Sequence, residues 1–150
     1  MSQGPWTAFN AAKLKFLNGT ISLAAHSFNV ALLSSSQVIS STFTGTSGNA
    51  QYSDLTGELA TAAGYTNGGQ LLSSVTLTSS AGIVTFTSGN PTWSLTGGGI
   101  TFKYATIFDV TAANKDLAFY CDMNLGGGSV SPIAGVLEIL QSTFGIFNFD

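Results

Sequence analysis

The 150-residue chain is rich in apolar residues and poor in charge: 44% of its residues are hydrophobic, 7% are charged, and the net charge is −3. An ordinary soluble domain carries about 25% charged residues. With four lysines and no arginine, the chain cannot form the basic face that nucleic-acid binding or a polybasic membrane anchor requires. It also lacks an apolar run of about 18 residues that could span a membrane as a helix.

Serine, threonine, glycine and asparagine must therefore cover the surface in place of charge. Such a coat is soluble but provides little repulsion between molecules, which is typical of proteins that work in assemblies. The single cysteine, Cys121, excludes an internal disulfide. Met1 to Asn18 show no basic segment followed by an apolar stretch, so we expect no signal peptide and synthesis in a cytoplasm.

The first expected element is a short helix near the N-terminus. Its apolar face follows the 3.6-residue period at Phe9, Ala12, Lys13, Phe16 and Leu17. Thr7 is the expected N-cap, and Asn18-Gly19 is expected to end the helix because glycine tolerates the left-handed conformation found there. A helix this short is not stable alone, so its apolar face must dock on the rest of the chain.

After Gly19 the hydrophobic period changes to two, which predicts strands separated by turns rich in Gly, Asn and Ser. The expected strands are Thr20–Leu23, Phe28–Ser34, a short piece near Val38–Ile39, Gln70–Ser79, Ile83–Thr87, Thr92–Leu95, Ile100–Phe108, Leu117–Met123, Ile133–Leu140 and Phe144–Phe149. Residues 34–64 carry no strong period, apart from an expected short turn of helix at Tyr52–Leu55.

This spacing predicts one all-β domain over residues 1–150, an antiparallel β-sandwich of jelly-roll type with a short N-terminal helix. Residues 1–19 form its N-terminal arm and helix, and residues 141–150 form a C-terminal strand or tail. Gly64 and the pair Gly68-Gly69 suit positive φ or a close backbone approach around Tyr65, which is a scaffold role.

No catalytic or metal-binding pattern is complete. One His and one Cys cannot form a zinc site. Cys121 falls in phase with the apolar residues of its strand, so we expect an inert core thiol rather than a nucleophile paired with His26, which we expect in a turn or at the surface. Asp122-Met123-Asn124 lacks the later glutamate of a calcium loop. The sequence therefore predicts no enzyme, no metal and no cofactor.

Other polar and aromatic residues have simple structural interpretations. Asp54 and Glu58 could form a carboxylate pair, but Asp54 after Ser53 is typical of a turn or helix start. Lys103 is expected to be solvated. Trp93 is expected in the core near a strand end, although an exposed Trp93 together with Tyr65 would offer platforms for stacking a sugar.

Several segments, taken in order, resemble a widespread family of small virion structural proteins from tailed bacteriophages. They are Ala12-Lys13-Leu14-Lys15-Phe16-Leu17-Asn18-Gly19, Ile21-Ser22-Leu23, Val30-Ala31-Leu32-Leu33, Tyr52-Ser53-Asp54-Leu55, Gly64-Tyr65-Thr66-Asn67-Gly68-Gly69-Gln70-Leu71-Leu72, Trp93 after a hairpin, and Gly135-Val136-Leu137. The likeness covers roughly Phe9 to Leu140, and the family offers no catalytic residues to carry over.

The resemblance implies a virion protein, made in the host cytoplasm, whose partners are the major capsid protein or other virion proteins. The leading expectation is a capsid cement, or decoration, protein that stabilises the shell by non-covalent contacts between capsomers and forms homo-oligomers, without binding nucleic acid or membrane. The alternatives are a head-fibre or tail module of the virion and, from another class, a carbohydrate-binding adhesin domain.

Large apolar residues near the chain ends are the expected assembly contacts, because chain ends are usually polar unless something ties them down. They are Trp6, Phe144, Ile146, Phe147 and Phe149. In the last strand, Phe144 and Ile146 share one face while Phe147 and Phe149 share the other. A strand that is apolar on both faces needs cover on both sides, either from its own core alone or from its core and a neighbouring subunit.

Overall fold

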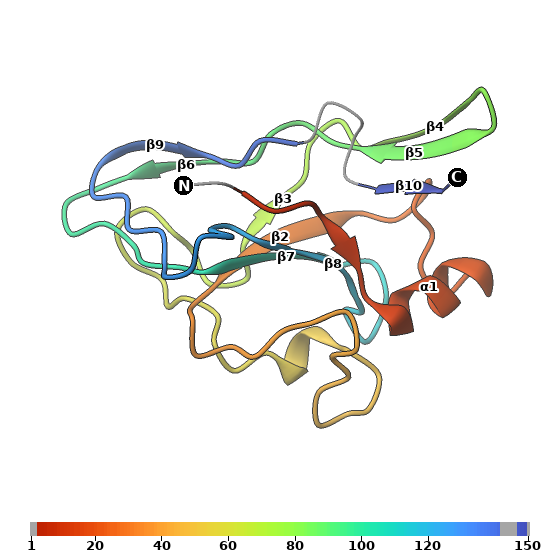
Figure 1. Ribbon diagram of the computed structural model, residues 1–150, viewed down its shortest axis with the longest axis horizontal. Coiled ribbons are helices and arrows are strands. Elements are labelled where there is room, and N and C mark those ends of the chain that lie inside the picture. The colour runs from red at the N-terminus through yellow and green to blue at the C-terminus, as the bar shows by residue number, and fades with distance from the viewer. Residues whose placement is uncertain (1–2, 142–146, 150) are drawn as a thin grey trace.

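The computed structural model describes residues 3–141 and the backbone of residues 147–149 (Figure 1). The chain is mostly β structure, with antiparallel strand pairing and one short α-helix. In chain order the elements are β1 Thr7–Ala8, α1 Asn10–Leu17, β2 Phe28–Leu33, the 3-10 turn η1 Tyr52–Asp54, β3 Gln70–Leu71, β4 Thr76–Ser80, β5 Ile83–Thr87, β6 Thr92–Leu95, β7 Tyr104–Asp109, β8 Leu117–Asp122, β9 Gly135–Glu138 and β10 Phe147–Phe149. Within residues 3–141, no helix is long and apolar enough to cross a membrane.

A five-stranded antiparallel sheet in the order β1-β8-β7-β2-β3 forms one layer. Its central strands β2 and β7 are buried on both faces, which explains the nearly continuous apolar run of β2. Side chains on both faces of β7 are covered, since Ala105 and Ile107 are as buried as Phe108.

The remaining strands lie across one face of this sheet (Figure 1). They form a three-stranded sheet in the order β10-β5-β4 and a two-stranded pair of β6 with β9. Phe86 of β5 connects the layers: its ring centroid lies 5.5 Å from that of Phe28 on β2 and 5.5 Å from that of Phe119 on β8. The core thus lies between the five-stranded sheet and the strands above it.

The N-terminal helix is confirmed, but its expected N-cap is wrong. Thr7 belongs to β1, where it pairs with Tyr120 of β8, and Phe9 occupies the N-cap position without a side-chain hydrogen bond. Asn18 ends the helix and Gly19 follows at φ +79°. The helix docks through Ala12 and through Phe16, whose ring stacks on Phe119 at 5.4 Å.

Two expected strands, Thr20–Leu23 and Val38–Ile39, are wrong. The first is folded into a turn by local hydrogen bonds, and the second is irregular. Ile21 N donates to the carbonyl of Lys15, and His26 N donates to that of Ser22, so Thr20–Leu23 continues the helix end as a compact turn. At Val38–Ile39 the chain is irregular: the Gln37 side-chain oxygen accepts hydrogen bonds from the backbone amides of Thr56 and Gly57 instead.

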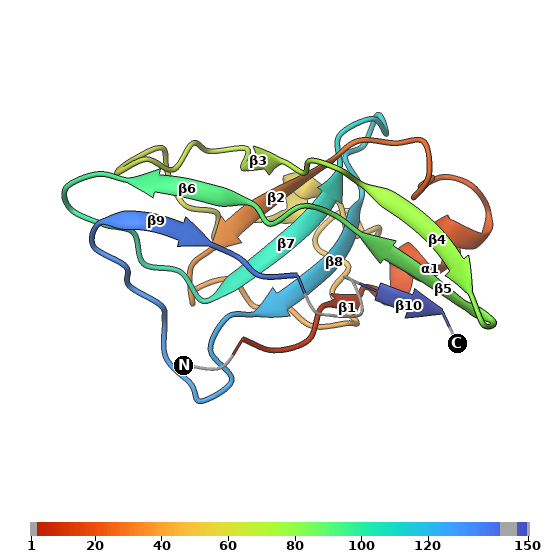
Figure 2. The same cartoon turned by 90° about the horizontal axis from the view of Figure 1, so that it is seen from above.

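The expected long strand Gln70–Ser79 is split into β3 and β4. Between them Leu72 N donates to the carbonyl of Phe28, and Ser74 adopts φ +50°. A left-handed residue breaks a strand, and here the break carries the chain from the five-stranded sheet to the layer above it. Ala81 and Gly82 then form a two-residue hairpin turn, with φ +52° and +83°. Figure 2 shows this β4–β5 hairpin lying over α1 at one end of the molecule.

Candidate functional site

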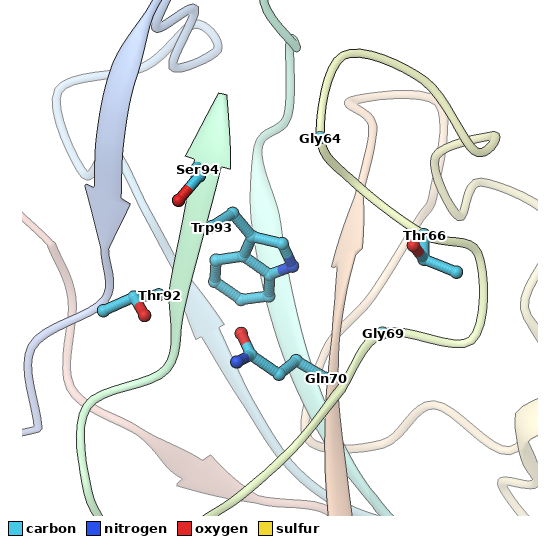
Figure 3. Close-up of a pocket in the computed structure, with 7 residues that line it drawn as sticks. All are labelled: Gly64, Thr66, Gly69, Gln70, Thr92, Trp93 and Ser94. Atoms are coloured by element: carbon cyan, nitrogen blue, oxygen red, sulfur yellow. The ribbon is translucent and has the colours of Figure 1, made fainter. Parts of the chain in front are cut away.

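Two open regions of the surface are candidates for binding: a polar recess beside Trp93 and an apolar groove beside α1. The polar recess has a volume of about 270 Å³ and lies between the loop 64–70 and strand β6 (Figure 3). It is lined by Gly64, Thr66, Gly69, Gln70, Thr92, Trp93 and Ser94. None of these side chains carries a charge at neutral pH, so the recess can donate and accept hydrogen bonds but cannot perform acid–base chemistry.

Close backbone packing builds the recess, as the glycines of the loop predict. A Cβ on Gly64 would lie 2.1 Å from the Ser94 carbonyl oxygen, and one on Gly69 would lie 2.1 Å from that of Val30. Gly64, Gly68 and Gly69 all have positive φ. The loop is thereby pressed against β6 on one side and β2 on the other.

The aromatic rings beside the recess belong to the core, as expected for Trp93. Tyr65 is 1% exposed and Trp93 is 5% exposed, with their ring centroids 6.2 Å apart. Neither ring presents a face to solvent, so the sugar-stacking platform that would favour an adhesin is not formed. What remains open is the polar edge, where the Gln70 Oε1 atom is buried without a hydrogen-bond partner in the part of the chain that the structure describes.

Glu58 anchors the recess loop. Its carboxylate accepts hydrogen bonds from Tyr65 Oη at 2.7 Å, from Gly68 N at 2.7 Å and from Tyr52 Oη. Burial and the hydrogen bond to Glu58 raise the pKa of Tyr52 above its ordinary value, and burial does the same for Tyr65. Both phenols therefore stay protonated and act as donors, which makes this cluster a structural clamp.

Asp54 belongs to a separate network, so the carboxylate pair considered for Asp54 and Glu58 is not formed. Asp54 accepts hydrogen bonds from Thr46, Ser47 and the Gln51 amide. Burial alone would raise its pKa, but these hydrogen bonds outweigh burial and lower the pKa to about 2. The turn role expected for Asp54 is confirmed: its charge holds the loop 45–54 together.

Most of the other charges also serve the fold. Lys15 Nζ lies 2.6 Å from Asp116 Oδ1, and His26 Nδ1 lies 2.5 Å from Asp109 Oδ2 in the turn where His26 is expected. Lys103 is not simply solvated, contrary to expectation: its Nζ lies 2.8 Å from Asp122 Oδ1 and donates to the Asn124 carbonyl at 2.6 Å. Asp122, the first residue of the segment considered as a calcium loop, is therefore paired with a lysine. Among the described residues, no group of three or more His, Cys, Asp or Glu could hold a metal ion.

Cys121 is buried, as its phase in the strand predicts. Its Sγ lies 3.1 Å from the carbonyl oxygen of Gly4. Burial raises the pKa of the thiol to about 12, so the reactive thiolate is scarce at neutral pH. His26 binds Asp109 instead of this sulfur.

The expected assembly residues fall into three groups. Trp6 is 7% exposed and packs in the core of the same chain. Phe147 and Phe149 lie in β10, whose backbone pairs with β5 opposite Phe86 and Val84. Phe144 and Ile146 lie outside the described residues. An assembly role for these residues stays a prediction.

The apolar groove is a feature that the sequence analysis missed. It has a volume of about 550 Å³ and lies between the end of α1, the turn after it and the underside of the β4–β5 hairpin. Its lining residues are Phe16, Leu17, Gly19, Ile21, Ser22, Leu23, Ala24, Leu77 and Val84. Leu17 is 82% exposed at its rim. The helical period predicts Leu17 on the face of α1 that docks on the core. Leu17 is instead exposed, because it is the last residue of the helix and the core does not extend far enough to cover it.

The comparisons with known proteins found no similar family model, curated protein or solved structure.

Proposed function

We propose that the protein is a structural component of a tailed-phage virion, and specifically a capsid cement protein that binds the assembled shell between capsomers. The observation that carries the proposal is the apolar groove, which is open among the described residues although the core beside it is filled by Phe16, Phe86 and Phe119. An open apolar groove of this kind marks a contact site for another protein. Its occupant in this proposal is an apolar segment of the major capsid protein.

The charge distribution supports contacts of this kind. Residues 59–102 contain no Asp, Glu, Lys, Arg or His, and the ion pairs at Lys15, His26 and Lys103 lie within the fold. A surface of hydroxyl groups and apolar side chains binds through shape, dispersion and hydrogen bonds. Such binding adds buried area to a shell without covalent chemistry.

The layered strands support the finer fold prediction. We infer a β-sandwich, because the five-stranded sheet and the strands above it share the aromatic core around Phe86. The jelly-roll connection pattern stays a prediction. A head-fibre or tail module is the alternative role in the virion, since the same groove would serve there.

The proposal is tested first by location. Antibodies raised against the recombinant protein are used to probe purified virus particles from the source of the gene, followed by cryo-electron microscopy of those particles. We expect the chain on the outer shell between capsomers. Density on a fibre or tail would support the alternative module, and absence from all particles would contradict a virion role.

The groove is then tested with a matched pair on one helix. Leu17→Asp places a charge in the groove, whereas Leu14→Asp places the same charge at a residue that is also exposed but does not line the groove. We expect Leu17→Asp to lose binding to shells stripped of the protein at least about tenfold, about 1.4 kcal/mol, while Leu14→Asp binds normally. Equal binding by both variants would contradict the groove as the shell contact.

A further inference from the structure

Among the described strands, β4 is an open edge of the upper layer. It is the last strand in the order β10-β5-β4, and all five of its residues, Thr76–Ser80, are exposed. An edge strand presents a row of unpaired N–H and C=O groups, which most proteins protect with lysine, proline, a bulge or a covering loop. The sequence Thr-Leu-Thr-Ser-Ser contains neither lysine nor proline, and its pairing with β5 runs without a register shift.

The other edges with described side chains are less suited to pairing. Strands β1 and β3 have two residues each. The loop around Gly64 covers β6, because a Cβ there would lie 2.1 Å from the Ser94 carbonyl oxygen and Thr96 N donates to the Ala63 carbonyl. Strand β9 carries the charged residue Glu138. Among these edges β4 combines length, exposure and lack of charge.

The register of the hairpin determines which backbone groups of β4 point outward. Ser80 pairs with Ile83 across the two-residue turn, and the closing pair of such a hairpin is hydrogen-bonded. Hydrogen-bonded and non-hydrogen-bonded pairs alternate along an antiparallel ladder. Thr76, Thr78 and Ser80 therefore direct their backbone groups to β5, whereas Leu77 and Ser79 direct theirs to the open edge.

We propose that two copies of the chain pair antiparallel through β4, about a two-fold axis at Thr78. This register places Leu77 opposite Ser79 of the second copy, so that the outward groups of both strands meet, and it overlaps the whole strand. The two three-stranded sheets become one continuous sheet. The proposal concerns the free protein and goes beyond its proposed place in a virion.

The composition of this region favours a second copy as the partner. With no charged residue between Glu58 and Lys103, two identical edges meet without repulsion, whereas a charged partner strand would find no counter-charge. Thr78 would meet its own copy on the outer face, where cross-strand threonine pairs are favourable. On the inner face Leu77 lines the groove, so the second strand extends the roof of the groove.

A five-residue pairing is a small interface, below the roughly 1,000 Å² typical of stable complexes, so we expect a weak dimer. Sedimentation velocity of the purified chain at about 100 μM, a concentration that populates a micromolar dimer, should show it. Thr78→Lys and Thr78→Glu each place like charges at the axis and should each raise the dimer Kd at least about tenfold. An equal mixture of the two variants should restore a dimer.

Val136→Lys is the matched control, because it adds the same charge at an exposed strand residue outside the hairpin, the recess and the groove. It should dimerise like the unmodified chain. A wild-type chain that stays monomeric overturns the proposal. So does a dimer that Thr78→Lys leaves unchanged, or charge variants whose mixture stays monomeric although circular dichroism shows each to be folded.

Covalent trapping measures the register independently. Directly opposed residues of a non-hydrogen-bonded pair lie about 4.5 Å apart at Cα, which is close enough for a disulfide. Thr78→Cys should form a dimer under mild oxidation that dithiothreitol reverses, whereas Val136→Cys in β9 should not. Equal crosslinking of the two variants overturns the proposed axis. Because these tests use no particles, they can fail or succeed separately from the virion role.

Discussion

The five-stranded sheet and the β4–β5 hairpin are both antiparallel β structure, but they have opposite surroundings. Strands β2 and β7 are buried on both faces, whereas β4 is exposed along its whole length. The sheet gains its stability from apolar burial. The hairpin contributes one large buried anchor, Phe86, while all five residues of β4 stay exposed. Two regions with similar backbone structure thus have different roles: the sheet stabilises the fold, and the hairpin presents an exposed surface.

The largest expected difference between the two regions is the cost of truncating an apolar side chain. Phe119 of β8 is fully buried and stacks with Phe86 and Phe16, so Phe119→Ala should lower the free energy of unfolding by about 4 kcal/mol. Leu77 of β4 is 39% exposed, so Leu77→Ala should cost about 1 kcal/mol. Urea denaturation measures both. Equal losses would remove the distinction between the sheet and the hairpin.

A pair of glycines tests the same distinction at the backbone. Gly69 has φ +71°, and its Cβ would meet the Val30 carbonyl of the sheet, whereas Gly82 has φ +83° and open space around it. Both alanine variants incur the cost of a left-handed residue, about 1–2 kcal/mol. Gly69→Ala must also move backbone, so its total cost should reach about 3 kcal/mol. Thermal unfolding with Gly82→Ala as the control separates the clash from the φ effect.

Acid should act on the loops beside the five-stranded sheet and leave the hairpin unaffected, because residues 59–102 contain no titratable acid or base of the Asp, Glu, Lys or His type. Asp54 has a folded pKa of about 2 against an ordinary value of 3.8. A lowered pKa stabilises the fold above pH about 4, and this stability is lost as the pH falls from about 4 to 2.

The contribution of Asp54 is at most about 2 kcal/mol, since one pKa unit corresponds to about 1.4 kcal/mol. Asp54→Asn should lower stability at neutral pH and flatten the decline between pH 4 and 2. Thermal unfolding of the variant and of the unmodified chain, at several pH values between 4 and 2, measures how steeply stability falls with pH. An unchanged slope in the variant would show that other carboxylates control the acid response.

The smallest expected effect is that of salt on association through the hairpin or the groove. Screening acts on charges, and the groove and β4 contain none. The dimer Kd and the retention on shells should therefore change less than about tenfold between low and high sodium chloride. The mixed dimer of Thr78→Lys with Thr78→Glu is the positive control, because salt should weaken it. A strong salt effect on the unmodified chain would point to an interface elsewhere.

Local patterns in the sequence were sufficient for the strands that carry clear alternation or strong turn signals. Thr92–Leu95 and Ile83–Thr87 match β6 and β5. Cys121 is buried, as its phase with apolar neighbours predicts, and Trp93 is buried near a strand end, as expected. These predictions succeed because side-chain periodicity and turn chemistry depend on residues close in sequence.

Only the tertiary structure decided where those patterns are interrupted and which surfaces stay open. Thr7 has the side chain of an N-cap but pairs with Tyr120 across the sheet, and the apolar run after Gln70 breaks at Ser74 to cross between layers. The groove at Leu17 and Leu77 brings together residues far apart in sequence. The sequence by itself determined the local elements and the near-absence of charge; long-range pairing, which no local period encodes, determined the groove, the recess and the open edge of β4.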